Sequence, residues 1–271
     1  MDDGVELAAE VTGDGPGLLL VHGLGGAKED FADHVPTLAR DHTVVIFDHR
    51  GHGASDKPRD VAAYSFSRLV ADTLAVADAT GLEHFRLLGH SMGGMVARKI
   101  AIHDQSRVDA LVMMDTSPGP VPGFDPALVD LACDLALERG KDALKELLDM
   151  VSVLESPAHK RLVEKRPGYA EFEARKWNDM SEIMWATLLR ELAYQTDDLP
   201  EMVATLRVPL LVLVGAQDQP FVIAAHAMAD AIPGTQLVVI PDAGHSPQFE
   251  NPEVWIAALT GFLSTLPATA R

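Results

Sequence analysis

The feature that most constrains the fold is a serine placed between two glycines, where an apolar segment ends and a helical pattern begins. Residues 89–93 read Gly-His-Ser-Met-Gly; an apolar pair precedes them, and apolar residues recur at helical spacing after them. The glycines permit a sharp turn that would present the Ser91 hydroxyl beyond the end of a strand. The backbone N–H of Met92, at the start of the next helix, would then be free to meet a negative charge. An ordinary glycine-rich turn fits these residues equally well, so the rest of the chain must decide.

Several apolar runs predict strands that are buried on both faces of a sheet. They cover residues 18–21, 44–47, 85–88, 110–114, 210–214 and 237–240. Helical patterns between the earlier runs, such as residues 67–79, predict an α/β fold with a doubly wound, mostly parallel sheet. Ligands of such a sheet bind beyond the carboxyl ends of its strands. Residues 22–26, His-Gly-Leu-Gly-Gly, follow the first run and suit an anion-binding loop, although glycine-rich loops after strands are also common.

An insertion without strand patterns separates the last two runs from the others. It begins with the breaker-rich segment Pro-Gly-Pro-Val-Pro-Gly at residues 118–123. Helices are expected to open at Asp125 and at Ser156, each an N-cap residue followed by proline, and another is expected over residues 179–194. We therefore predict a core of residues 1–117 and 206–271 and an all-helical cap of residues 118–205.

Four large apolar side chains of the cap are candidates for lining a substrate pocket. They are Trp177, Met180, Met184 and Trp185. Methionine and tryptophan can shape an apolar pocket, but the same stripe is typical of the inner core of a helical unit. Helical periodicity does not distinguish the two roles.

A serine, an acid and a histidine follow predicted strands in the order Ser91, Asp218 and His245. Serine is a poor nucleophile at neutral pH and needs a base, a role that histidine fills because its ordinary pKa is about 6.5. A carboxylate must fix the tautomer of the imidazole and stabilise its charged form. This order is the one expected for a serine on a strand–helix turn of a doubly wound sheet. The sequence therefore predicts a catalytic triad.

The segment of residues 48–55, Asp-His-Arg-Gly-His-Gly-Ala-Ser, is rich in ionisable groups but is not expected to bind a metal. Its histidine spacing matches no standard zinc pattern, and no cysteine accompanies it. A loop that hydrogen-bonds to itself is the better interpretation, with Arg50 near Asp48 or Asp56. We expect His52 and His90 to be structural, because the triad needs only one base.

Composition argues against several classes of function. A formal net charge of −18 disfavours nucleic-acid binding, because phosphates would be repelled. The single Cys133 cannot form an internal disulfide and is expected to be buried. The N-terminus shows neither the basic nor the apolar part of a signal peptide, and no apolar run approaches the ~18 residues of a membrane span. A cytoplasmic protein with no membrane partner is expected, and its oligomeric state stays open.

The sequence closely resembles the α/β-hydrolase family, in particular compact bacterial esterases and lactonases with a helical cap. The resemblance runs over nearly the whole chain and rests on residues 22–26, 48–55, 89–94, 215–218 and 244–245. It implies that Ser91 is the nucleophile and His245 the base, that the N–H groups of Leu24 and Met92 form an oxyanion hole, and that the cap covers the site.

Two positions depart from the family pattern. The N-terminus is shorter than usual, so one edge strand fewer is expected. Asp115 also ends a predicted strand, at a place where some relatives carry the acid of the triad. We prefer Asp218 as the acid and expect Asp115 to make a turn beside Thr116 or to support the site from behind.

The resemblance predicts a cofactor-free enzyme that cleaves small-molecule carboxylic esters, and also lactones, through an acyl-enzyme on Ser91. A haloalkane dehalogenase or an epoxide hydrolase of this family would carry aspartate at position 91. Two alternatives remain open. One is a carbon–carbon bond hydrolase with the same triad, and the other is a ligand-binding protein that keeps the fold without turnover.

Overall fold

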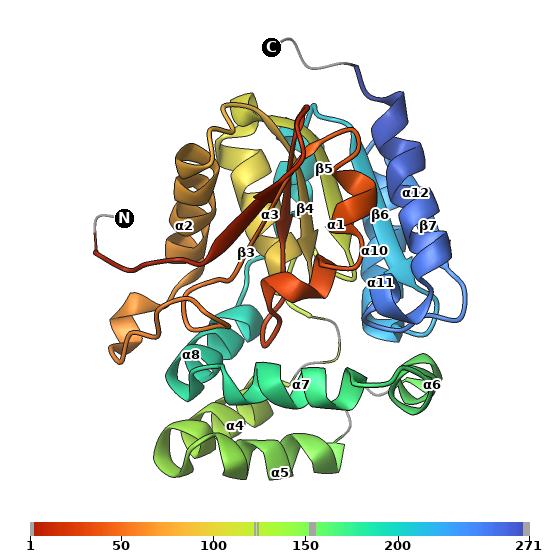
Figure 1. The fold of residues 1–271 in the computed structure, drawn as a ribbon. Coiled ribbons are helices and arrows are strands. Elements are labelled where there is room, and N and C mark those ends of the chain that lie inside the picture. Colours follow the sequence, from red (N-terminus) through yellow and green to blue (C-terminus); the bar gives the residue numbers. More distant parts are fainter. Residues whose placement is uncertain (1–2, 122, 124, 152–155, 268–271) are drawn as a thin grey trace.

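A computed structural model describes residues 3–121, 123, 125–151 and 156–267 of the chain. Its centre is a seven-stranded sheet in which, among these residues, β1 alone runs antiparallel to its neighbour (Figure 1). The strand order is β1-β3-β2-β4-β5-β6-β7. The strands are β1 (Ala9–Thr12), β2 (Gly17–Val21), β3 (Thr43–Phe47), β4 (Phe85–His90), β5 (Val108–Met114), β6 (Leu210–Gly215) and β7 (Gln236–Ile240). The predicted α/β fold with a mostly parallel sheet is confirmed.

The strand order reverses between β2 and β4. The chain leaves β2 to add β3 on one side and later returns to add β4 on the other. β2 and β4 pair in parallel, with Val21 opposite Gly89. A reversal of this kind opens a crevice beyond the carboxyl ends of the two strands, where doubly wound sheets bind their ligands. Residues 22–26 and Ser91 follow these two strand ends, so the fold places both beside this crevice.

Helices cover both faces of the sheet because its strands are apolar on both sides. α1 (Val35–Leu38) and α12 (Pro252–Thr265) lie on one face, and α2 (Phe66–Ala79), α3 (Met92–His103) and α10 (Gln219–Ala231) lie on the other (Figure 1). Successive residues of β4 alternate between the layers: Leu87 packs with α2 and α3, and Leu88 packs with α1 and α12. The remaining short helices of the core are η1 (Lys28–Phe31), η2 (Val61–Ala63), η3 (Gln105–Arg107) and α11 (Pro247–Glu250).

The insertion between β5 and β6 is helical and contains no strand among its described residues. Its helices are α4 (Pro126–Arg139), α5 (Lys141–Val151), α6 (Pro157–Lys165), α7 (Tyr169–Asn178), α8 (Glu182–Ala193) and α9 (Leu199–Thr205). The first five lie beyond the carboxyl edge of the sheet (Figure 1), whereas α9 packs against α3 and α10 of the core. The predicted helix starts are confirmed, because the side chains of Asp125 and Ser156 cap α4 and α6.

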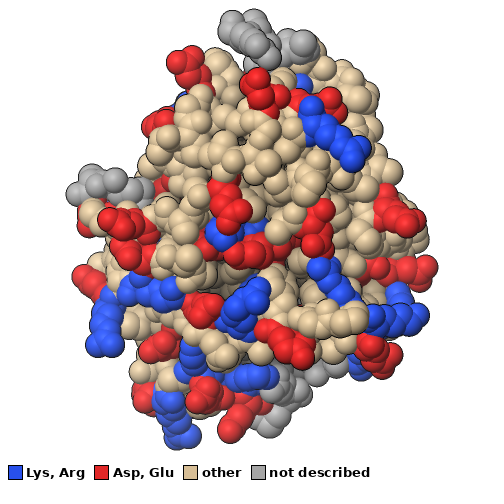
Figure 2. Space-filling model, in the orientation of Figure 1, with Lys and Arg blue, Asp and Glu red and all other residues tan. Residues whose placement is uncertain are grey.

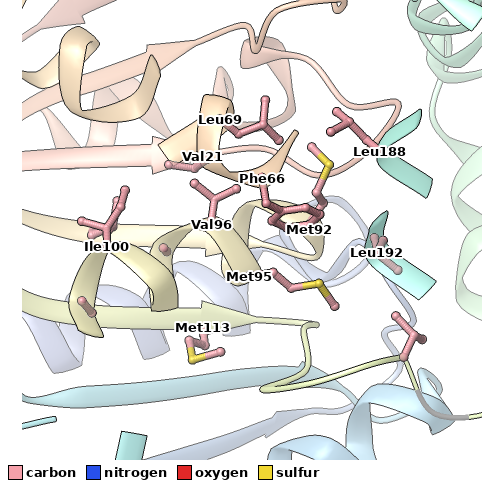
Figure 3. Close-up of a cluster of buried hydrophobic side chains, with 14 of the residues drawn as sticks. Val21, Phe66, Leu69, Met92, Met95, Val96, Ile100, Met113, Leu188 and Leu192 are labelled. Atoms are coloured by element: carbon pink, nitrogen blue, oxygen red, sulfur yellow. The ribbon is translucent and has the colours of Figure 1, made fainter. Parts of the chain in front are cut away.

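The cap and the core share a large apolar cluster. Leu188 and Leu192 of α8 pack toward Phe66 of α2 and Met92 and Met95 of α3 (Figure 3). The same cluster reaches α4, where Cys133 is buried as predicted, and burial raises the pKa of its thiol to about 11. α8 is therefore packed into the main core, and α4 rests on α8.

The predicted partner of Arg50 is wrong. Its guanidinium forms two hydrogen bonds with Asp72 of α2, at 2.6 and 2.7 Å, and a third with Asp3 at 2.8 Å. Asp48 instead accepts hydrogen bonds from the backbone N–H groups of Lys28 and Ala54. Both Arg50 and Asp72 are about 1 % exposed, so this pair joins the loop to α2 in the interior.

Charged side chains are distributed unevenly over the face shown in Figure 2. Acidic side chains occur over both halves of that face, while most of its lysines and arginines lie over the lower half, where the cap is. Among the described residues, no helix combines the length and the apolar character that crossing a membrane requires.

Candidate active site

Ser91 lies at a sharp turn between β4 and α3, in a backbone conformation that residues other than glycine rarely adopt. Its φ is 53° and its ψ is −119°. Neighbouring groups hold this conformation: the N–H of Ser91 donates to the carbonyl of Met114 at 2.9 Å, and the Thr116 hydroxyl donates to the carbonyl of Ser91 at 2.7 Å. Strain of this kind persists only where the surroundings impose it, and it is concentrated at functional sites.

The glycines around Ser91 are required by close backbone contacts. A Cβ at Gly89 would lie 2.2 Å from the carbonyl oxygen of Gly93, and a Cβ at Gly93 would lie 2.3 Å from the carbonyl oxygen of Val21. Side chains cannot approach other atoms so closely. The two glycines therefore allow α3 to start directly against β2 and β4, which is the context that the five-residue pattern needed.

The loop of residues 22–26 lies directly against Ser91. A Cβ at Gly23 would be 3.0 Å from the Cβ of Ser91. The N–H groups of Leu24 and Met92, the two predicted oxyanion-hole donors, have no hydrogen-bond acceptor in the described part of the chain. Two free amides beside a strained serine suit the stabilisation of a developing oxyanion.

Two buried histidines hold this loop in place. Nε2 of His52 accepts a hydrogen bond from the N–H of Gly25 at 3.1 Å, and Nε2 of His22 accepts one from the N–H of His49 at 3.0 Å. Each ring therefore carries its proton on Nδ1, which donates to the carbonyl of Arg50 from His52 and to that of Gly23 from His22. Burial lowers the pKa of both rings, so both stay neutral. These hydrogen bonds agree with the structural role expected for His52.

An acid and a histidine meet at the carboxyl ends of β6 and β7. Nδ1 of His245 donates a hydrogen bond to Oδ2 of Asp218 at 2.7 Å. This bond places the proton on Nδ1 and leaves the lone pair of Nε2 free to accept a proton. The ring packs between His90 and Phe221, with ring centroids 4.9 and 5.0 Å away.

The backbone on either side of His245 is held by two side chains. Nε2 of His90 donates to the carbonyl of His245 at 2.7 Å. The carboxylate of Glu250 accepts hydrogen bonds from the N–H groups of Gly244 and Ser246, at 2.6 and 3.2 Å. This role of Glu250 was not identified from the sequence. The position of Glu250, five residues after the histidine, is only a weak signal of it.

Within the described residues, no hydrogen bond joins the Ser91 hydroxyl to the imidazole of His245. Catalytic hydrogen bonds are often long in free enzymes and shorten when a substrate binds. The two residues are linked through His90, which directly precedes Ser91 and contacts His245 by both a hydrogen bond and its ring. The structure thus brings the serine and the Asp218–His245 pair to one edge of the sheet.

Asp115 lies beside this pair but is not bonded to the imidazole. It follows β5 with a left-handed φ of 44°, and its Oδ1 accepts a hydrogen bond from the N–H of Gly215 at 2.9 Å. Burial and the nearby charge of Asp218 raise the pKa of Asp115 well above its ordinary value. The carboxylate that holds His245 is Asp218.

The four cap residues proposed to line a pocket lie in different surroundings. The sulfur of Met180 is about 4.0 Å from where a Cβ at Gly25 would be, so Met180 packs on the loop of residues 22–26. Met184 packs on Gly51 and is fully buried. Trp185 is buried in the shared apolar cluster, and Trp177 is partly buried against it. Met180 is thus the one of the four that the structure places against this loop.

The cap also brings polar groups toward the core that the sequence did not reveal. Nζ of Lys176 on α7 pairs with Oδ1 of Asp30 at 2.8 Å. Asp30 is buried and lies on η1, which follows the loop of residues 22–26. Within the cap, Nε2 of His159 on α6 lies 3.7 Å from Glu173 on α7. Lys176 and Asp30 are 146 positions apart in the sequence, and a contact over such a separation leaves no periodic pattern to read.

Comparison with known proteins agrees with this architecture. The chain matches the model of the α/β hydrolase fold over residues 16–252, so it belongs to the α/β-hydrolase family. A protein of Pseudomonas savastanoi pv. phaseolicola, "Putative carbamate hydrolase RutD", is 28% identical over 260 residues, which cover 93% of this chain and 95% of that protein. Among solved structures, a thermophilic esterase from Thermogutta terrifontis superposes with a TM-score of 0.83 at 28% identity, covering 96% of this chain and 94% of its own. An N-acyl homoserine lactone degrading enzyme, Est816, superposes with a TM-score of 0.79 at 26% identity, covering 97% and 98%.

Proposed function

We propose that the protein is a serine hydrolase that cleaves carboxylic esters and lactones through an acyl-enzyme on Ser91. The observation that carries this proposal is the convergence of a strained serine directly after β4 with an Asp218-bound His245 at the same edge of the sheet. The esterase and the lactone-degrading enzyme among the similar structures support the choice of substrate class.

In the proposed reaction, Nε2 of His245 takes the proton of the Ser91 hydroxyl while the serine oxygen attacks the substrate carbonyl carbon. The N–H groups of Leu24 and Met92 stabilise the negative charge that forms on the carbonyl oxygen. The imidazolium then returns the proton to the leaving alcohol, and the acyl group stays on Ser91. A water molecule, deprotonated by the same imidazole, releases the acid and restores the serine. Asp218 stabilises the charged imidazole in each half-reaction.

The alternative of a carbon–carbon bond hydrolase receives less support. Family members with that activity usually carry basic or polar groups in the pocket for a substrate carboxylate. Two cap cations that contact the core are paired with core acids: Lys176 with Asp30 at 2.8 Å, and Arg166 with Asp33 at 2.6 Å. An uncharged ester or lactone fits these surroundings better.

A panel of substrates tests the proposal. We expect hydrolysis of p-nitrophenyl esters with short acyl chains and of simple lactones, measured beside an aryl carbamate and a vinylogous diketone. Ser91→Ala should abolish ester turnover, and His245→Ala should reduce it by several orders of magnitude. Labelling of the wild type by a fluorophosphonate, absent in Ser91→Ala, would locate the nucleophile independently of the substrate.

Matched variants control for general effects of substitution. Ser106 and His226 are exposed residues of the core that are not part of the proposed site. Ser106→Ala and His226→Ala should keep wild-type turnover. Equal ester hydrolysis by Ser91→Ala and wild type would overturn the proposed function.

A further inference from the structure

We propose that Asp115 carries a proton on Oδ2 and donates it in a hydrogen bond to the carboxylate of Asp218, and that it thereby holds the acid behind His245 as a positioning residue. The inference rests on the proposed function, since it assigns a role behind the proposed triad.

The position of Asp115 is fixed by the sheet. The residue directly follows β5, which lies between β4, the strand that leads to Ser91, and β6, the strand that leads to Asp218. Its N–H donates to the carbonyl of Leu213, and its Oδ1 accepts from the N–H of Gly215, so both ends of the residue are bound to β6. Because Asp218 donates its own N–H to the carbonyl of Gly215, the two acids are fastened to the same short turn.

The second oxygen of Asp115 has no donor. Asp115 is about 1 % exposed, and its Oδ2 makes no hydrogen bond as an acceptor in the described part of the chain. A buried ionised oxygen without a donor is costly, whereas a protonated one needs only an acceptor. The carboxyl of Asp115, the carboxyl of Asp218 and the imidazole of His245 each place one atom within 4.8 Å of the others. The acceptor that Asp115 needs is therefore the neighbouring carboxylate.

The charges around Asp115 favour the same assignment. The ionisable groups that face it are Asp218 on the turn after β6, His245 on the loop after β7, and Glu250 on α11. Two carboxylates in one buried site do not both ionise readily, because each disfavours the charge of the other. Asp218 is the one stabilised in its ionised form, since it accepts the Nδ1–H of His245. The shared proton consequently resides on Asp115.

The hydrogen bond from Asp115 would fix the orientation of the Asp218 carboxylate. A carboxylate that accepts hydrogen bonds from both sides has little freedom to rotate, so its Oδ2 stays directed at Nδ1 of His245. A neutral donor achieves this without adding a second negative charge beside the imidazole. A purely structural role for Asp115, capping β6 through Oδ1, would affect folding but would not affect the imidazole.

Two variants separate these roles. Asp115→Asn keeps an acceptor for Gly215 and supplies an N–H donor for Asp218, with no proton to lose. Asp115→Leu has a similar size and neither function. The readouts are kcat and KM for an ester, the pH profile of kcat/KM, the infrared carbonyl band of a protonated carboxylic acid near neutral pH, and the downfield proton resonance of the Asp218–His245 hydrogen bond.

The proposal expects the infrared band to be present in the wild type and absent in Asp115→Asn. Asp115→Asn should retain most of kcat and leave the acid limb of the pH profile in place. Asp115→Leu should lower kcat by about tenfold to a hundredfold and shift or broaden the downfield resonance, with a much smaller effect on KM.

Three outcomes would overturn the proposal. One is the absence of a carboxylic-acid band that depends on Asp115. Another is an acid limb that moves to lower pH in Asp115→Asn, which would show that a negative charge had been removed. The third is a folded Asp115→Leu protein with wild-type kcat. The infrared and resonance measurements need no turnover, so they test the proposal even if Ser91 proves not to be a nucleophile. If Asp115→Leu does not fold, the infrared band and the pH profile of Asp115→Asn test the proposal instead.

Discussion

His90 donates a hydrogen bond from Nε2 to the backbone carbonyl of His245 at 2.7 Å, while its ring packs against the ring of His245. The residue that directly precedes the proposed nucleophile thus fixes the residue proposed as its base. Burial, reinforced by the neighbouring His245, lowers the pKa of His90 to about 3, so this ring is a neutral donor at every pH at which the enzyme would work. Positions 90 and 245 lie on β4 and after β7, and their contact ties the two sides of the site together.

The bond between His245 and Asp218 predicts which acid matters for catalysis. Asp218→Asn should lower kcat by about a thousandfold to ten-thousandfold, because an amide favours the wrong tautomer of the imidazole. Steady-state kinetics on one ester would measure the loss. Asp242→Asn is the matched control: this aspartate is exposed and has a left-handed φ of 54°, which asparagine also tolerates. A larger loss in Asp115→Asn than in Asp218→Asn would reverse the assignment.

The contact of Gly23 with Ser91 predicts a loss of rate without a loss of the fold. In Gly23→Ala the new Cβ would lie 3.0 Å from the Cβ of Ser91, so the loop or the serine must move by a few tenths of an ångström. Displacement of an oxyanion donor should cost about tenfold to a hundredfold in kcat.

Gly261 provides the control for this glycine. It lies in α12 with no atom within 4 Å of a Cβ built on it, so Gly261→Ala should keep wild-type kcat and raise the free energy of unfolding by about 0.5–1 kcal/mol. Unchanged kcat in a folded Gly23→Ala protein would mean that the loop of residues 22–26 is not the oxyanion loop.

The raised pKa of Asp115 predicts how stability depends on pH. An unfolded aspartate has a pKa of about 3.9, so between this value and the higher folded pKa the folded state holds a proton that the unfolded state has released. The free energy of unfolding therefore falls as pH rises through that interval, by up to about 1.4 kcal/mol per pH unit for one proton. Asp115→Asn lacks this contribution. Urea denaturation of both proteins across that range should show the variant gaining stability relative to the wild type as pH rises, and a constant difference would contradict the prediction.

The buried pair of Arg50 and Asp72 predicts a large effect of breaking it from one side. Asp72→Ala should lower the free energy of unfolding by about 3–5 kcal/mol, because the buried guanidinium loses the two hydrogen bonds that Asp72 accepts and its buried counter-charge. Replacing both residues, as Arg50→Met with Asp72→Leu, should cost much less. Arg190, whose ion pairs with Asp130 and Asp134 are exposed, is the control, and Arg190→Met should cost about 0–1 kcal/mol. Thermal and urea unfolding would measure all three, and equal losses in the single and double variants would contradict the prediction.

Much of the core could be predicted from the sequence because parallel strands are buried on both faces and appear as short apolar runs. The residues that follow those runs, among them Ser91, Asp115 and Asp218, could then be assigned to one edge of the sheet. The helix starts at Asp125 and Ser156 were likewise predictable, because a capping side chain and a following proline act within a few residues. These predictions succeeded where the physical cause is local.

The failures have a common physical cause, which is dependence on distant parts of the chain. The partner of Arg50 lies on another helix, and the carboxylate that binds Gly244 and Ser246 comes from Glu250 on α11. Helix α7 was not predicted, because Tyr169–Asn178 carries charged residues among its apolar ones and follows Gly168, whose left-handed φ of 79° marks a turn. The surroundings of Trp177 and Met184 could not be told apart by spacing, since a pocket wall and a packed interface have the same period.

The way α8 is packed gives the two parts of the cap different evolutionary freedom. Because Leu188 and Leu192 are integral to the interior that α3 occupies, most substitutions in α8 would threaten folding itself. α6 and α7 contact the core through a small separate cluster, in which Leu162 and Tyr169 pack with Phe249 of α11, and through the Lys176–Asp30 ion pair, so substitutions there disturb less of the interior. New substrate preferences within this lineage should therefore arise first in α6 and α7, while α8 changes slowly.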